Sequence, residues 1–165
     1  MDGFYNALIS DTTDKIPEEY DWFAPLIGDW DFDYYDQYDK DKPRHVKGEW
    51  IFRRILEGAG IEDMFICPSR VERITNPQPD GEYGVAIRMF NPHTKVYDMV
   101  YTTFGFMTRV TFGKENSMLV GKPDYDKNAR WVFREITENT FHWQNITIME
   151  NGDWRINVNV YAKRK

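Results

Sequence analysis

The stretch that decides the fold is Gly28-Asp29-Trp30-Asp31-Phe32-Asp33-Tyr34, in which acidic and aromatic residues alternate. Successive side chains of a β-strand point to opposite faces, so this alternation predicts a strand with aspartates facing water and aromatic rings facing a core. Aspartates can also bind metal ions, but these and the nearby Asp36, Asp39 and Asp41 lack the spacing and the glycine of a calcium-binding loop. We therefore expect the solvated exterior of a strand here.

Period-two alternation continues from residue 28 to the C-terminal end, and turn-forming residues interrupt it at short intervals. This pattern predicts about ten strands joined mostly by short connections. A meander of that length leaves two unpaired edges unless it closes on itself. We therefore expect an all-β fold, a closed up-and-down antiparallel barrel of about ten strands. The expected strands are Asp29–Asp36, Gly48–Leu56, Ile61–Ile66, Tyr83–Phe90, Val96–Thr103, Met107–Phe112, Ser117–Lys122, Arg130–Ile136, Thr140–Glu150 and Trp154–Ala162.

The first 27 residues lack this alternation. Pro17 precedes two glutamates, as in the first turn of a helix, so residues 1–27 are expected to form a short helical or irregular lead. The length of 165 residues fits a single domain over residues 1–165, with the barrel at 28–164.

The composition narrows the classes of function. The net charge of −6 lacks the basic footprint of a nucleic-acid-binding protein, and no apolar run is long enough to span a membrane. The N-terminal residues lack the basic and apolar regions of a signal peptide, and a single cysteine cannot form an intramolecular disulfide. We expect a cytoplasmic protein that binds neither nucleic acid nor membranes.

Antiparallel pairing of the first and last strands would bring the end of the chain beside its first strand. Arg164 or Lys163 would then lie near the ring of Trp30, where a guanidinium can stack on the indole. This arrangement, with Gly28 and Trp30 in a G-x-W motif, resembles the lipocalin and calycin barrels, in which a late arginine covers that tryptophan. The resemblance implies that Trp30 and Arg164 close the barrel.

Three further regions extend the resemblance over nearly the whole expected barrel. They are Gly48–Trp50 with residues 55–64, then Ala86–Pro92, and then Phe141–Gln144 with Asn151–Trp154. Together they are similar to an uncharacterised bacterial lipocalin-like (calycin) β-barrel domain family of unknown function. The resemblance implies the fold and no particular chemistry.

Metal-binding and nucleophilic motifs are missing from the sequence. The histidines His45, His93 and His142 are far apart, and no pair has the spacing of zinc ligands. A haem ligand at His142 is the alternative to an exposed strand histidine, and we expect the latter, with no metal and no cofactor. Cys67 beside Pro68 is expected to be a buried, unreactive thiol.

Charged residues inside expected strands are more informative. Arg54 shares a strand face with Trp50 and Phe52, and Asp63, Arg88 and Arg134 also stand among apolar residues. Burying an unpaired charge costs free energy, so such groups either pair with one another or hold a polar group of a ligand, such as a carboxylate. The many aromatic residues likewise either fill the core or line a cavity.

These features favour binding over catalysis. We expect the barrel to hold a small apolar or amphipathic molecule, with an anionic group as one option. This hypothesis requires a cavity open at one end and at least two of the four charges pointing inward. The candidate ligand-binding residues are Arg54, Asp63, Arg88, Tyr101, Arg134 and Trp143.

Two alternatives remain open. A cofactor-free isomerase, cyclase or lyase would use Asp63 as a base, Arg88 to hold an anionic substrate, and Tyr101, and it requires these residues to lie together. An interaction scaffold or homodimer would instead use the acidic segment 1–41 or the strand at 131–136, which carries apolar residues on both faces.

Overall fold

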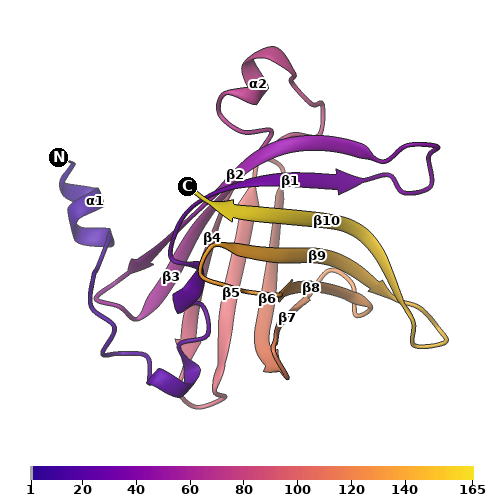
Figure 1. Ribbon diagram of the computed structural model, residues 1–165. Coiled ribbons are helices and arrows are strands. Elements are labelled where there is room, and N and C mark those ends of the chain that lie inside the picture. Colours follow the sequence, from indigo (N-terminus) through magenta and orange to yellow (C-terminus); the bar gives the residue numbers. More distant parts are fainter. Residues whose placement is uncertain (1) are drawn as a thin grey trace.

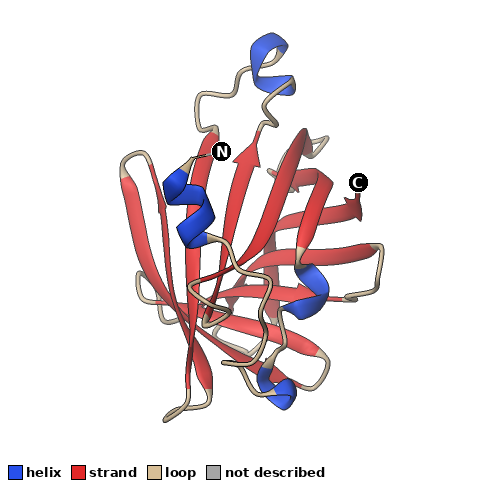
Figure 2. Ribbon diagram, turned by 90° about the vertical axis from the view of Figure 1, so that its left-hand side faces the viewer, coloured by secondary structure: helices blue, strands red, loops and turns tan. Residues whose placement is uncertain are grey.

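The computed structural model describes residues 2–165 and shows an all-β, closed antiparallel barrel (Figures 1 and 2). Within these residues ten strands follow one another around the barrel in chain order, and β1 pairs with β10 to close it. This confirms the fold expected from the alternation. The strands are β1 (Gly28–Asp36), β2 (Arg44–Ile55), β3 (Gly60–Cys67), β4 (Glu82–Asn91), β5 (Val96–Thr103), β6 (Phe106–Glu115), β7 (Met118–Pro123), β8 (Ala129–Arg134), β9 (Thr140–Ile148) and β10 (Trp154–Arg164).

Some strands run longer than expected, since β2 starts at Arg44 and β6 ends at Glu115, and two strands end earlier than expected because of their backbone conformation. Leu56 was expected to end the strand that starts at Gly48, but it stands in the turn after β2 with a φ of 54° and is 46% exposed. Strand β8 ends at Arg134 rather than at Ile136, because Glu135 has a φ of 52°. A positive φ takes a residue out of the β region, which periodicity in the sequence does not reveal.

Short helices lie at both ends of the barrel. The lead contains α1 (Gly3–Leu8) and two 3₁₀ helices, η1 (Glu18–Tyr20) and η2 (Ala24–Leu26), so it is helical and irregular as expected. Helix α2 (Glu72–Thr75) was not expected, because the connection from residue 68 to 81 was interpreted as loop. Ser69, three residues before the helix starts, accepts a hydrogen bond from the Glu72 backbone N–H at 3.1 Å.

The lead fills one end of the barrel. Phe23 and Leu26 are fully buried, and the ring of Phe23 packs edge-on against Tyr97, Phe112 and Phe133. The opposite end carries the connections β1–β2, β3–β4 with α2, β5–β6, β7–β8 and β9–β10 (Figure 1). The barrel is therefore closed by apolar side chains at one end, and any opening lies at the other.

The junction of β1 and β10 joins the lead to the barrel. Trp30 is paired in register with Arg164, whose guanidinium carbon lies 4.1 Å from the centroid of the indole ring. The same guanidinium donates hydrogen bonds to the carbonyls of Pro25, Ile27 and Glu138 at 2.7–2.8 Å. One side chain thus links the last strand to the lead and to the β8–β9 connection.

The outer face of β8 is covered within the chain. Val132 alternates with the inward Trp131 and Phe133, yet it is 0% exposed because it packs with Val120, Ile146 and Met118 on neighbouring strands. Its apolar exterior therefore does not by itself require a partner. No helix in residues 2–165 is long and apolar enough to cross a membrane.

Candidate ligand-binding site

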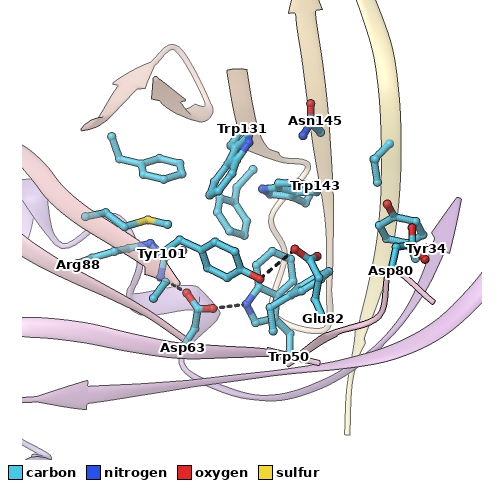
Figure 3. Close-up of a pocket in the computed structure, with 16 residues that line it drawn as sticks. Tyr34, Trp50, Asp63, Asp80, Glu82, Arg88, Tyr101, Trp131, Trp143 and Asn145 are labelled. Atoms are coloured by element: carbon cyan, nitrogen blue, oxygen red, sulfur yellow. Dashed lines mark hydrogen bonds and ion pairs between the residues drawn. The ribbon is translucent and has the colours of Figure 1, made fainter. Parts of the chain in front are cut away.

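A cavity of about 350 Å³ occupies the barrel interior between the lead and the end that bears α2 (Figure 3). Its walls combine aromatic and apolar side chains with a few polar groups, as in pockets that bind small molecules. Its volume lies near the lower end of the roughly 300–1,000 Å³ range of such pockets. The lining residues are Tyr34, Trp50, Asp63, Phe65, Asp80, Glu82, Ala86, Arg88, Met99, Tyr101, Phe112, Trp131, Phe133, Trp143, Asn145 and Val158.

The inner end of the cavity holds a buried ion pair. Asp63 of β3 and Arg88 of β4 are each 1% exposed, and Arg88 donates to one oxygen of the Asp63 carboxylate. The other oxygen accepts a 2.6 Å hydrogen bond from the Trp50 indole N–H. The Arg88 guanidinium also lies over the Phe23 ring at 4.9 Å. Both charges are therefore compensated by protein groups.

The middle of the cavity holds a tyrosine–carboxylate pair. The Tyr101 hydroxyl donates to Oε1 of Glu82 at 3.2 Å (Figure 3). Gly84 lies beneath this tyrosine, and a Cβ at that position would overlap the ring and its hydroxyl. The missing side chain at Gly84 thus gives Tyr101 the room to reach Glu82.

Burial controls the acidity of this pair. Burial raises the pKa of the Glu82 carboxyl, the hydrogen bond from Tyr101 lowers it, and the negative charge of Asp80 raises it, with a net upward shift. Burial and the neighbouring Glu82 also raise the pKa of the Tyr101 hydroxyl. A carboxyl with a raised pKa in a cleft is typical of a functional site.

The outer end of the cavity is polar on one side and aromatic on the other. Asp80 bonds to Arg44 through both oxygens at 2.8 Å, and Arg44 also binds Asp36. Hydrogen bonding to Arg44 lowers the pKa of Asp80. On the aromatic side, the Trp131 indole N–H donates to the Tyr125 hydroxyl at 3.2 Å.

The structure brings four of the six sequence-based candidates together and leaves two outside. Asp63, Arg88, Tyr101 and Trp143 all line the cavity (Figure 3). Two placements correct the sequence-based assignment.

Arg54 points inward from β2 but toward the lead, where it forms a bidentate pair with Asp21 at 2.6 and 3.0 Å. Arg134 alternates with the inward Phe133, so it lies on the outer face and donates to Gln144 at 3.3 Å. The sequence correctly placed Arg134 on a strand face that carries apolar residues, but this is the covered outer face of β8 and not the inner face.

Glu82 is the functional candidate that sequence analysis missed. It occupies the same inward face as Gly84, Ala86 and Arg88, two residues apart along β4. Extending the alternation back from Arg88 would have found it. The turn at Asp80-Gly81 placed the expected start of the strand one residue too late.

Two other residues that the sequence singled out do not line the cavity. His142 was expected to be exposed, but its side chain is only 12% exposed, stacked on the Tyr161 ring at 4.5 Å and bonded to Asn159 at 2.7 Å. Cys67 is buried at the end of β3, where burial raises its thiol pKa to about 12. Residues 2–165 hold no cluster of three or more metal-ligating side chains.

Comparison with known proteins supports the fold. The chain resembles Rv2717c from M. tuberculosis, with a TM-score of 0.57 and 10% identity over 91% of this chain and 99% of that one. It also resembles the S-type phycobiliprotein lyase CPES from Guillardia theta, with a TM-score of 0.57 and 10% identity over 87% of this chain and 90% of that one. No family model and no curated protein matches the sequence. These neighbours fit a lipocalin-like barrel, and at such identity the likeness establishes the fold alone.

Proposed function

We propose that this protein binds one small amphipathic molecule inside its barrel. The observation that carries the proposal is the cavity of about 350 Å³, with aromatic walls and polar groups converging from β3, β4 and β5. The lead seals one end with Phe23 and Leu26, so a ligand enters from the end that bears Asp80. The expected pair of inward charges is present in Asp63 and Arg88.

The Asp63–Arg88 ion pair disfavours an anionic ligand. Arg88 is the only cationic residue among those that line the cavity, and it is held by Asp63. An incoming carboxylate would have to share Arg88 with Asp63, and it would also face the carboxylates of Asp80 and Glu82. The option of an anionic ligand is therefore dropped from the proposal.

Catalysis inside the barrel is the second candidate function. One structural neighbour is the S-type phycobiliprotein lyase CPES from Guillardia theta. The sequence suggested an acid–base set made of Asp63, Arg88 and Tyr101, and the contacts of these residues do not support it. Asp63 accepts hydrogen bonds from Trp50 and Arg88, and Tyr101 donates to Glu82 instead. A raised pKa instead favours Glu82 as a general base. With a substrate in hand, loss of turnover with unchanged affinity in Glu82→Gln would separate catalysis from binding.

Indole N–H signals provide a site-specific test of binding. Trp50, Trp131 and Trp143 line the cavity, whereas Trp22 and Trp30 lie in the lead and at the barrel closure. Titration of ¹⁵N-tryptophan-labelled protein with phenylbutanol should shift the first three signals and leave the last two in place. Failure of the cavity signals to move at saturating probe would overturn the proposal.

A matched pair of variants locates the binding. Ala86 lines the cavity and is 1% exposed, so Ala86→Phe should fill the space and abolish the shifts. Ile87, the next residue of β4, faces the exterior, and Ile87→Phe should leave the titration unchanged. Equal shifts in both variants would place the probe outside the barrel.

A further inference from the structure

Among the carboxylates that line the cavity, one has no cationic partner within the described residues. Asp63 pairs with Arg88, and Asp80 pairs with Arg44. Within residues 2–165, no Lys, Arg or His nitrogen lies within 4.0 Å of the Glu82 carboxylate, whose one side-chain partner is the Tyr101 hydroxyl. A partly buried carboxylate that lacks a cation is costly, so the cavity space beside it suits a group of positive charge.

The surroundings of Glu82 also suit a cation. The rings of Tyr101 and Trp131 meet edge to face at 5.6 Å, and Trp131 and Trp143 are 6.1 Å apart on the same side of the cavity (Figure 3). The faces of such rings attract organic cations, most strongly where water is excluded. Carboxylate and aromatic rings thus converge on one space from β4, β5, β8 and β9.

We propose that the ligand of this cavity is an organic cation, a primary amine or a substituted ammonium, whose charged group pairs with Glu82 and whose apolar body lies against Trp131 and Trp143. This inference rests on the proposed function and names the chemical class of its ligand. The apolar body accounts for the aromatic walls, and the cation compensates the carboxylate that the protein itself leaves unpaired.

Binding of a cation should depend on pH through Glu82. The titratable groups near it are Asp80, Tyr101, Tyr34 of β1 and Cys67 of β3. Two cations also lie nearby, but Arg44 is paired with Asp36 and Asp80, and Arg73 donates to the Glu82 backbone carbonyl rather than to its carboxylate. A cation favours the ionised form of Glu82, so affinity should fall as the pH drops and this carboxyl becomes protonated. Because the pKa of Glu82 is raised in the free protein, that loss should begin above the pH at which an ordinary glutamate protonates.

The test compares three probes with the same apolar body by isothermal titration calorimetry at neutral pH. They are phenylbutylammonium, the neutral phenylbutanol and the anionic phenylbutyrate. The ammonium is expected to bind about tenfold or more tightly than the alcohol, since hydrogen bonds to charged groups contribute more than neutral ones. Phenylbutyrate is expected to bind most weakly.

A Glu→Gln pair of variants assigns the preference to one residue. Glu82→Gln should bring the ammonium-to-alcohol affinity ratio close to one. Glu62→Gln is the matched control, because Glu62 alternates with the inward Asp63 and faces the outside of β3. In this variant the ammonium-to-alcohol affinity ratio should stay the same as in the natural protein.

The outcomes separate the two proposals. The cation inference would be overturned, while the binding function stands, by either of two results. One is that phenylbutanol binds the natural protein as tightly as phenylbutylammonium does, and the other is that the ammonium-to-alcohol affinity ratio is unchanged in Glu82→Gln. No binding by any of the three probes would overturn both.

Discussion

Asp63 and Arg88 are opposite charges in a place where water does not reach them. Their mutual contact and the Trp50 hydrogen bond replace the hydration that each lost on folding. The pair therefore contributes chiefly by preventing an unpaired buried charge, and the structure should tolerate its joint removal better than the loss of one member.

Replacing Arg88 alone tests this account. Arg88→Met should lower the free energy of unfolding by about 3–5 kcal/mol, because the Asp63 carboxylate remains buried and unpaired. The double variant Asp63→Leu/Arg88→Met should be more stable than Arg88→Met, with a residual loss of about 1–3 kcal/mol from the unsatisfied Trp50 N–H. Urea unfolding of Arg88→Met, Asp63→Leu and the double variant measures these changes, and simple additivity of the two single losses would contradict this explanation of the pair.

Gly84 provides a second test at the level of one residue. Gly84→Ala should displace Tyr101, weaken its bond to Glu82 and lower the free energy of unfolding by about 1–3 kcal/mol. Gly113 is the control, since a Cβ there would meet only Val96 at 4.0 Å, and Gly113→Ala should change stability by no more than about 0.5 kcal/mol. Equal effects of the two substitutions in urea unfolding would show that Tyr101 does not depend on this space.

Alternation in the sequence pointed to some of the residues of the site, but it did not predict the contacts between them. It showed that Asp63 and Arg88 share strand faces with apolar residues, but it did not decide which face of each strand points into the barrel. It did not indicate that Tyr101 bonds to Glu82 rather than to Asp63, because the choice of partner depends on the register between β4 and its neighbours. Pairings of this kind arise only when the strands are assembled.

At the scale of elements, strands were easier to predict than the lead. A strand of eight residues such as Val96–Thr103 repeats its pattern several times, and its bounds were found in full. The helices η1 and η2 have three residues each, too few for a helical period to appear. Their positions are decided by the burial of Phe23 and Leu26 in the barrel end, a tertiary effect.

The lead should therefore contribute to the stability of the barrel. Phe23→Ala removes a fully buried ring that packs against Tyr97 and Phe112 and lies beneath Arg88. Its expected cost is about 3–5 kcal/mol. Phe4→Ala, in the same segment but at a residue that is 72% exposed, should cost no more than about 0.5 kcal/mol. Thermal unfolding compares the two variants, and an equally mild effect at Phe23 would show that the lead is only loosely attached.

At the scale of the whole molecule, closure depends on the junction of β1 and β10. Arg164→Ala should remove the stacking on Trp30 and three hydrogen bonds to backbone carbonyls, at a cost of about 2–4 kcal/mol. Lys163→Ala, one residue earlier on the exposed outer face, is expected to be nearly neutral. Hydrogen exchange of β1 and β10 amides would show whether the loss is local to this junction, and unchanged protection in Arg164→Ala would contradict its role in closure.

The proposed function requires that a small molecule binds inside this barrel. Isotope-filtered nuclear Overhauser measurements on labelled protein with saturating phenylbutylammonium test it most directly. We expect contacts from the probe to the Ala86 and Met99 methyl groups and to the Trp143 ring, which all line the cavity. Contacts confined to exposed side chains such as Phe104 and Met107, which are 105% and 69% exposed, would place the probe on the exterior and contradict the claim.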